Sequence, residues 1–344
     1  MYWHWMLLSF FLSTALSPLV ARMAAAFGIV DEPGVPRKVH KEPVPLLGGL
    51  AIFISLGVTL ILALVLTNRL TASEINASHY VGFLVGGAML MLGGFLDDTF
   101  TLKPRLSMLF PIMAALAAIA GGVEVTKLTN PLGGVILLEP WQSNVLVFVW
   151  LLVVMYVTKL LDGLDGLSTS VVSVGALAIV LLSLSAAYYQ PDVALFASIG
   201  LGVLLGFLVW NWSPAKIFLG EGGSTFVGYL LGVLAVVSGG KLATALLVLG
   251  IPILDLIWTI LRRARGGAKA IVSADRKHLH HRLFDLGWSQ PRIVFLYASL
   301  ALVFGVGALF LQSGQKILAL AALVVLMIAV AVLLTRRSSR GRLP

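Results

Sequence analysis

The chain has 344 residues, of which 59% are hydrophobic and only 11% are charged. Ordinary soluble domains contain about 25% charged residues, so this composition excludes a soluble fold and indicates that lipid is the main solvent. Cysteine is absent, which excludes disulfides, thiolate metal sites and a cysteine nucleophile. The net charge of +9 does not indicate nucleic acid as a partner, because the basic residues are spread over separate loops on one side of the membrane.

The apolar run at the N-terminus, residues 2–21, is followed by Arg22 and is not preceded by basic residues. A cleaved secretory signal has the opposite order, with its basic residues first. We therefore expect a retained first helix whose N-terminus lies outside.

Further apolar runs recur along the whole chain. A spanning helix needs about 20 mostly apolar residues, so the runs predict one all-α polytopic membrane domain, residues 1–344, with about eleven transmembrane helices and a cytoplasmic C-terminus. The fifth and eighth are short and could be tilted, broken or partly interfacial. Between the fourth and fifth, Gly122 to Glu139 allows a small β-hairpin. The runs lie at roughly 2–21, 47–68, 79–96, 106–122, 141–158, 168–189, 193–211, 222–239, 242–261, 293–314 and 317–335.

Lysine and arginine are divided unequally between the two sets of alternate loops. Twenty of the 24 fall on one side, and the other side has only Arg69, Lys127, Lys241 and Lys316. The positive-inside rule makes the first side cytoplasmic. Most acids and histidines of the loops fall on that side too, so five loops place polar side chains at one membrane surface. A protein that serves only as a helical anchor does not require this arrangement.

The first two cytoplasmic loops carry candidate phosphate and metal groups. The first loop has a basic cluster, which could bind a phosphate or equally well contact lipid headgroups. The cluster is formed by Arg37, Lys38, His40 and Lys41. In the second, Asp97 and Asp98 adjoin at a helix end, where two carboxylates repel and favour a bound cation or a shared proton. Their oxygens suit Mg²⁺, which usually pairs with substrate phosphates; two solvated interfacial acids are the alternative.

The third cytoplasmic loop contains Lys159, Asp162 and Asp165 with a glycine after each acid. A spacing of three places both acids on one face if the segment is helical. The glycines allow a tight turn or a close approach of the backbone to a ligand, and a simple glycine turn is the structural alternative.

The fourth loop runs from Asn211 to Ser224 and surrounds Glu221 with glycines just before a predicted helix. Glycine and serine at a helix N-terminus form a ready anion site. Phe218 could stack on a base or could face lipid.

The fifth loop, the longest and most basic, contains His278, His280, His281 and Arg282. The histidine spacing could bind zinc, but no thiolate accompanies it. Together with the basic residues, the histidines look more like phosphate ligands. Asp255, within the preceding apolar run, is an acid inside the membrane and is either functional or paired with a neighbouring arginine.

Together these loops resemble the polyprenyl-phosphate N-acetylhexosamine-1-phosphate transferases, glycosyltransferase family 4. The resemblance covers about Gly28 to Leu286 and rests on five motifs in the family's order: the loop 37–49, the Asp97-Asp98 pair, the segment 162–166, the segment 211–224 and the histidines 278–281. The family couples a UDP-linked N-acetylhexosamine 1-phosphate to a polyprenyl phosphate, releases UMP and uses Mg²⁺. The His-x-His-His form resembles the N-acetylglucosamine branch, whereas the muramoyl-pentapeptide branch usually has three consecutive histidines.

The resemblance implies a role for each matching position. Catalytic roles fall to Asp97, Asp98, Asp162 and His278. Substrate contacts fall to Lys41, Lys159, Asp165, Asn211, Phe218, His280, His281 and Arg282. The Mg²⁺ ligands would be Glu221 and Asp98, with Mn²⁺ as an alternative ion. Two positions depart from the pattern, because Lys159 stands where the family usually has asparagine and Glu221 where it usually has the metal-binding aspartate.

We therefore expect an enzyme on the cytoplasmic face of a bacterial inner membrane that transfers N-acetylglucosamine 1-phosphate, or a related N-acetylhexosamine 1-phosphate, from a UDP-sugar to undecaprenyl phosphate. This would be the first membrane step of cell-envelope polysaccharide synthesis. The sequence leaves open whether the protein forms a homodimer. It also leaves open whether the reaction proceeds by direct attack or through a covalent aspartyl intermediate. The alternatives are a phospho-N-acetylmuramoyl-pentapeptide transferase, a membrane transporter, and a non-catalytic lipid-binding relative.

Overall fold

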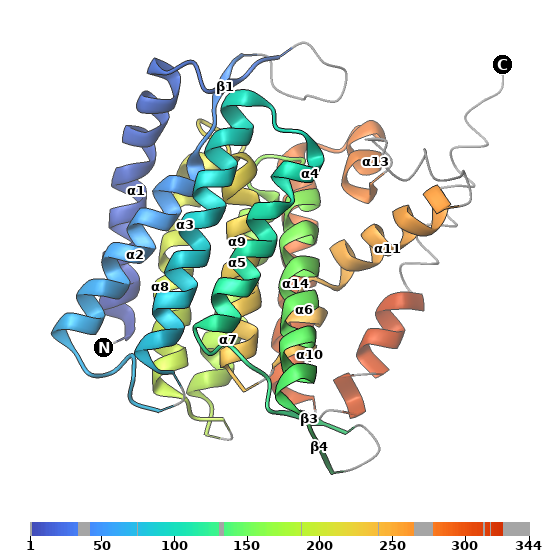
Figure 1. Cartoon of the computed structure of the whole chain (residues 1–344). Coiled ribbons are helices and arrows are strands. Elements are labelled where there is room, and N and C mark those ends of the chain that lie inside the picture. Colours follow the sequence, from blue (N-terminus) through green and yellow to red (C-terminus); the bar gives the residue numbers. More distant parts are fainter. Residues whose placement is uncertain are drawn as a thin grey trace.

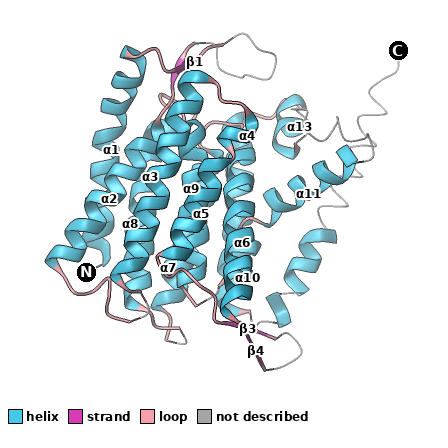
Figure 2. Cartoon of the chain, viewed as in Figure 1, coloured by secondary structure: helices cyan, strands magenta, loops and turns pink. Residues whose placement is uncertain are grey.

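A bundle of long helices makes up most of the computed structural model (Figures 1 and 2). The structure describes residues 2–33, 42–73, 75–130, 134–186, 188–239, 241–264, 278–311, 314–316 and 318–325. Eight described helices are long and apolar enough to cross a membrane. They are α1 (Tyr2–Ala26), α2 (Gly48–Leu66), α3 (Ala77–Phe100), α6 (Pro140–Leu161), α7 (Leu167–Leu184), α8 (Pro191–Asn211), α9 (Gly220–Val237) and α14 (Gln290–Phe310).

The prediction of a polytopic helical membrane protein is confirmed, and the count of eleven spans stays a prediction. In the described part of the chain, the fourth apolar run forms only the short helices α4 (Pro104–Ser107) and α5 (Leu109–Ala120). The ninth forms a broken pair, so nine spans result if that pair crosses once. The last run, 317–335, lies only partly within the described residues.

The break in the ninth run separates α10 (Leu242–Val248) from α11 (Gly250–Ala264), which meet at 76°. Pro252 explains the break, because proline has no N–H to donate and its ring clashes with the carbonyl four residues earlier. Figure 1 shows α11 turning away from the bundle. Of the two runs expected to be short, 141–158 lies in the longer continuous helix α6 of 22 residues, and 222–239 largely coincides with the unbroken but short helix α9 of 18 residues.

Helix α9 lies at the centre of the bundle and packs against α2, α3, α6 and α7. Of its 18 residues, 83% are buried, whereas 22% of the corresponding window of α1 is buried. A helix that is apolar all round is expected to be enclosed by others. The N-terminal end of α9 is therefore surrounded by the ends of its neighbours.

The remaining elements are short. Strands β1 (Val30–Asp31) and β2 (Val44–Pro45) pair antiparallel after α1, and the helix α13 (Leu279–Asp285) precedes α14. Strands β3 (Lys127–Thr129) and β4 (Val135–Leu137) pair antiparallel in the interval where the sequence allows a hairpin. Figure 1 shows β1, α4 and α13 at one end of the bundle and β3 and β4 at the other.

Candidate active site

Glycines bring three helix ends together at the end of the bundle that carries the polar loops. A Cβ added to Gly94 of α3 would lie 2.2 Å from the backbone of Gly222, and one added to Gly49 of α2 would lie 2.2 Å from the Cα of Gly223. Only glycine permits backbones to approach this closely. The last two turns of α3 and the first turn of α2 therefore contact the first turn of α9.

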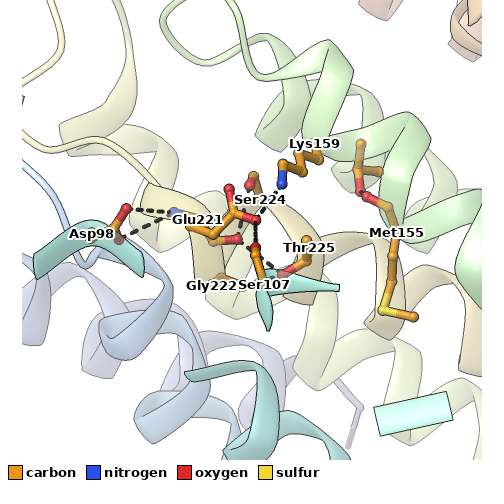
Figure 3. Close-up of polar contacts among 9 residues, drawn as sticks. Asp98, Ser107, Met155, Lys159, Glu221, Gly222, Ser224 and Thr225 are labelled. Carbon is orange, nitrogen blue, oxygen red and sulfur yellow. Dashed lines mark hydrogen bonds and ion pairs between the residues drawn. The ribbon is translucent and has the colours of Figure 1, made fainter. Parts of the chain in front are cut away.

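Asp98 occupies the N-terminus of α9 as a result of this approach. Both of its carboxylate oxygens lie 3.2 Å from the backbone N of Glu221, which donates to them (Figure 3). The first N–H groups of a helix have no partner within it, and a negative charge there is favoured by the helix dipole. The carboxylate of Asp98 therefore has a structural role, which is to cap the N-terminus of α9, besides the predicted chemical role.

The side chain of Glu221 points away from Asp98 (Figure 3). Its Oε1 forms an ion pair with the Lys159 ammonium from the last turn of α6. Ser107 of α4 donates from Oγ to the same oxygen at 3.3 Å. Ser107 was missed by the sequence interpretation because it belongs to no motif.

A cavity of about 430 Å³, a size in the range of small-molecule sites, is lined by residues from all five predicted cytoplasmic loops. Of the predicted residues, it is lined by Asp98, Lys159, Asp162, Asp165, Asn211, Phe218, Glu221 and His281. Asp31 and Gln290 also line it and were not predicted. Asp97 precedes Asp98 in the last turn of α3, His278, His280 and Arg282 lie in or next to α13, and Lys41 lies outside the described residues.

Three polar residues of the cavity hold its loops in place. The Asn211 amide donates to the Ile217 carbonyl at 3.0 Å and accepts from Thr169 Oγ1 at 2.9 Å. Asp165 accepts from the backbone N of Ala215 at 3.1 Å, and its own backbone N donates to Gln290 Oε1 at 2.9 Å. These contacts tie the loop after α6 to the loop after α8 and to the start of α14.

Asp162 lies in the cavity between these loops. Desolvation by burial, aided by the nearby carboxylates of Asp165, Asp98 and Glu221, raises the pKa of Asp162 to about 8. The side chain is then protonated at neutral pH and can donate a hydrogen bond to an anionic ligand.

The three histidines form one cluster at α13. The rings of His278 and His280 are stacked with centroids 5.8 Å apart, and those of His280 and His281 lie 4.3 Å apart. His278 Nδ1 lies 2.9 Å from Asp255 Oδ2 of α11, whose Oδ1 accepts from the Leu279 backbone N at 3.1 Å. The described partner of Asp255 is therefore a histidine, where the sequence had offered an arginine.

His280 is 2% exposed, and its Nε2 has no hydrogen-bond partner among the described residues. Burial, followed by the neighbouring His281 and His278, lowers the pKa of His280 well below its usual value. His280 is therefore neutral at pH 7 and can serve a ligand by hydrogen bonding but not by charge.

Gly163 lets the Asp162 loop approach the histidines, and Gly163→Ala tests this approach. The added Cβ would lie 2.6 Å from His280 Nε2 and 3.0 Å from His281 Nε2, so the rings must move. We expect turnover to fall about 10- to 100-fold, the scale of a displacement near 1 Å at a reacting group. Gly307→Ala on α14 is the matched control, since nothing lies within 4 Å of its added Cβ. Equal turnover of the two variants would contradict the expectation.

A second, apolar cavity of about 240 Å³ adjoins the first between α2, α3 and α9. Its walls include Leu50, Met91, Leu92 and Phe95, and Asp98 lies in its lining as well. Asp98 therefore stands where a polar cavity meets an apolar one.

The described residues, as placed, do not fit the predicted Mg²⁺ site. The carboxylates of Asp98 and Glu221 face different partners, and Lys159 engages the Glu221 oxygen. Within the described ranges, no group of three His, Cys, Asp or Glu side chains could hold a metal ion. Dependence on Mg²⁺ or Mn²⁺ stays a prediction.

Comparison with known proteins supports the family resemblance of the motifs over most of the chain. Residues 80–239 match the family described as glycosyl transferase family 4. The chain is 30% identical over 322 residues, 91% of its length and 86% of the relative's, to a Bacillus subtilis protein named probable undecaprenyl-phosphate N-acetylglucosaminyl 1-phosphate transferase.

Two further relatives align with the chain over similar fractions of its length. The decaprenyl-phosphate N-acetylglucosaminephosphotransferase of Mycolicibacterium smegmatis is 30% identical over 350 residues, 93% of this chain and 85% of the relative. The phospho-N-acetylmuramoyl-pentapeptide-transferase of Bacillus velezensis is 29% identical over 330 residues, 89% and 95% of the two chains. The ordered motifs, the site they form and these matches together show that the chain belongs to glycosyl transferase family 4, in the branch of the polyprenyl-phosphate N-acetylglucosamine-1-phosphate transferases.

Proposed function

We propose that the chain transfers N-acetylglucosamine 1-phosphate, or a related N-acetylhexosamine 1-phosphate, from a UDP-sugar to a polyprenyl phosphate and releases UMP. The observation that carries the proposal is the position of Asp98 in the lining of both cavities. A nucleotide sugar suits the polar cavity, and a lipid phosphate can approach the same carboxylate from the apolar one. The names of the relatives add the substrate classes.

The chemistry joins two anions, so the site must hold like charges together while charge develops on the leaving UMP. We favour direct attack by an oxygen of the lipid phosphate on the sugar-bearing phosphorus, which breaks that phosphorus's bond to the bridging oxygen leaving with UMP. Asp97 would position the lipid phosphate or accept its proton. A covalent intermediate on an aspartate remains the rival route.

The neutral polar groups would bind the donor. Protonated Asp162 can donate to a phosphate oxygen, and neutral His280 can hydrogen-bond to the diphosphate or the sugar. Lys159 supplies a positive charge within the same cavity.

Incorporation of labelled sugar into lipid tests the function. The full chain, purified into nanodiscs, is supplied with undecaprenyl phosphate and labelled UDP-N-acetylglucosamine, and labelled lipid and UMP are measured. We expect both in equal amounts, and neither when the lipid phosphate is left out. Absence of product with any UDP-N-acetylhexosamine would overturn the proposal and favour the non-catalytic alternative.

The muramoyl-pentapeptide alternative is tested in the same assay. Because the relative from Bacillus velezensis is named a phospho-N-acetylmuramoyl-pentapeptide-transferase, UDP-N-acetylmuramoyl-pentapeptide is the appropriate second donor to test. We expect it to yield little product, because the chain has the His-x-His-His spacing of the other branch. Preferential use of this donor would assign the chain to the muramoyl branch.

We further place the protein in a bacterial inner membrane with the cavity on the cytoplasmic side, as the loop charges indicate. The chain has no native cysteine, so single cysteines report orientation cleanly. Cysteine at exposed Ser289, next to the cavity, should react with an impermeant thiol reagent only in inverted vesicles. Cysteine at exposed Ser73, before α3 at the other end, should react in intact cells. The reverse pattern would invert the topology.

A further inference from the structure

The contact between Lys159 and Glu221 joins two charged residues from separate helices inside the polar cavity. The side chain of Lys159 is 33% exposed and that of Glu221 is 18% exposed, so both face the cavity. The ammonium also lies 5.7 Å from the centroid of the Tyr156 ring, one turn earlier on α6. Figure 3 shows the lysine reaching across to the Glu221 carboxylate, while Asp98 meets the backbone of Glu221 on the other side.

We infer that the Lys159 ammonium is a tethered cation that takes the place of a divalent ion at Glu221, so that Glu221 binds a metal only when the charge of Lys159 is removed. The inference rests on the proposed function, because transfer between two anions is what requires a fixed positive charge at this place. The inference concerns only an ion bound to Glu221. A different ion that enters together with the nucleotide is compatible with it.

The geometry leaves a divalent ion poorly served at Glu221. Mg²⁺ requires near-octahedral oxygen ligands at about 2.0–2.1 Å, but Oε1 already accepts from the Lys159 ammonium and from Ser107. Asp98, the predicted second ligand, directs both oxygens to the backbone N of Glu221. A divalent cation would also be repelled by an ammonium in contact with its own ligand.

The tethered charge remains available to a substrate. An ammonium has three N–H donors, so Lys159 can hold Glu221 and still donate to a phosphate oxygen in the cavity. Mg²⁺ delivers its charge only when bound, whereas the lysine is part of the chain. The partial exposure of the pair means that removal of the lysine leaves Glu221 open to ions from the cavity.

Mn²⁺ binding measured by electron paramagnetic resonance tests the inference without requiring turnover. The metal-stripped full chain is titrated with Mn²⁺ as wild type, Lys159→Met, Glu221→Gln, Lys159→Met/Glu221→Gln, and Lys127→Met. Lys127 is the matched control, because it is exposed at the opposite end and its removal changes the net charge equally. Thermal unfolding verifies that each variant is folded, and Lys159→Gln replaces Lys159→Met if that variant does not fold.

We expect Lys159→Met to bind one Mn²⁺ at least about 10-fold more tightly than wild type, equivalent to about 1.4 kcal/mol. The double variant should return to the wild-type affinity, which places the gained ion on Glu221, and Lys127→Met should match wild type. One tight Mn²⁺ in the wild type that Glu221→Gln removes would overturn the inference, as would no gain in Lys159→Met. These results do not depend on whether the labelled-lipid assay succeeds, so failure of the inference and of the proposed function can be told apart.

Discussion

Asp98→Asn is expected to lower turnover at least about 100-fold while the protein stays folded. A loss of this size is usual when a charge-stabilising or acid–base group is removed. The asparagine oxygen can still accept the Glu221 N–H that Asp98 accepts in the wild type, so the N-terminus of α9 keeps its cap. The substitution therefore removes the ionisable carboxyl group and leaves most of the structural contact. Turnover in the labelled-lipid assay and the melting temperature are the two measurements.

The controls separate charge from capping. Asp98→Ala removes both, and loss of a cap costs about 1 kcal/mol, so it should melt below Asp98→Asn while being equally inactive. Glu124→Gln removes the same charge from an exposed loop at the other end and should behave as wild type. Near-normal turnover of Asp98→Asn would leave capping as the role of Asp98. The same result for Asp97→Asn would return the whole pair to a structural role.

Much of the fold follows from the sequence because a membrane span has a simple signature. Uncharged runs of about 20 residues had to be helices, since no water satisfies backbone groups in lipid. The break in the ninth run was not predicted, although Gly250 and Pro252 lie within it. Counting apolar residues does not register a proline, and the resulting turn of 76° sends α11 out of the bundle.

The site was predictable where its residues belong to motifs and unpredictable where contacts cross between helices. Asp98 and Asp162 were expected from local pattern, and the cavity contains both. Ser107 and Gln290 stand outside every motif, and only the fold brings Ser107 to Glu221 and Gln290 into the cavity lining. The pair of Lys159 with Glu221 spans 62 residues of sequence. Both residues depart from the family pattern, but the sequence alone does not show that they contact each other.

Asp255 is expected to act as a positioning residue for His278. Its carboxylate contacts the imidazole Nδ1 at 2.9 Å and the backbone N of Leu279 at 3.1 Å, so one side chain of α11 holds both the histidine and the start of α13. The side chains of Asp255 and His278 are 11% and 8% exposed, which protects the contact from water. A carboxylate at Nδ1 selects the tautomer whose Nε2 is free to accept. Asp255→Asn should lower turnover about 100-fold with a smaller change in KM.

A control variant separates positioning from general destabilisation. Asp192→Asn also alters a buried carboxylate that accepts a backbone N–H, that of Ile75 at 2.8 Å, at the opposite end of the bundle. Both variants should melt at a lower temperature than wild type, but only Asp255→Asn should lose turnover.

The double variant decides whether Asp255 acts through the histidine. If it does, Asp255→Asn/His278→Ala should be no slower than His278→Ala alone, because residues that act as a unit are not additive. A merely structural contribution would add to the effect of His278→Ala instead. Additive losses, or equal turnover of Asp255→Asn and Asp192→Asn, would contradict the role. The coupling would also make the histidine cluster depend on where α11 lies, since the carboxylate that orients His278 is carried by the helix that turns out of the bundle.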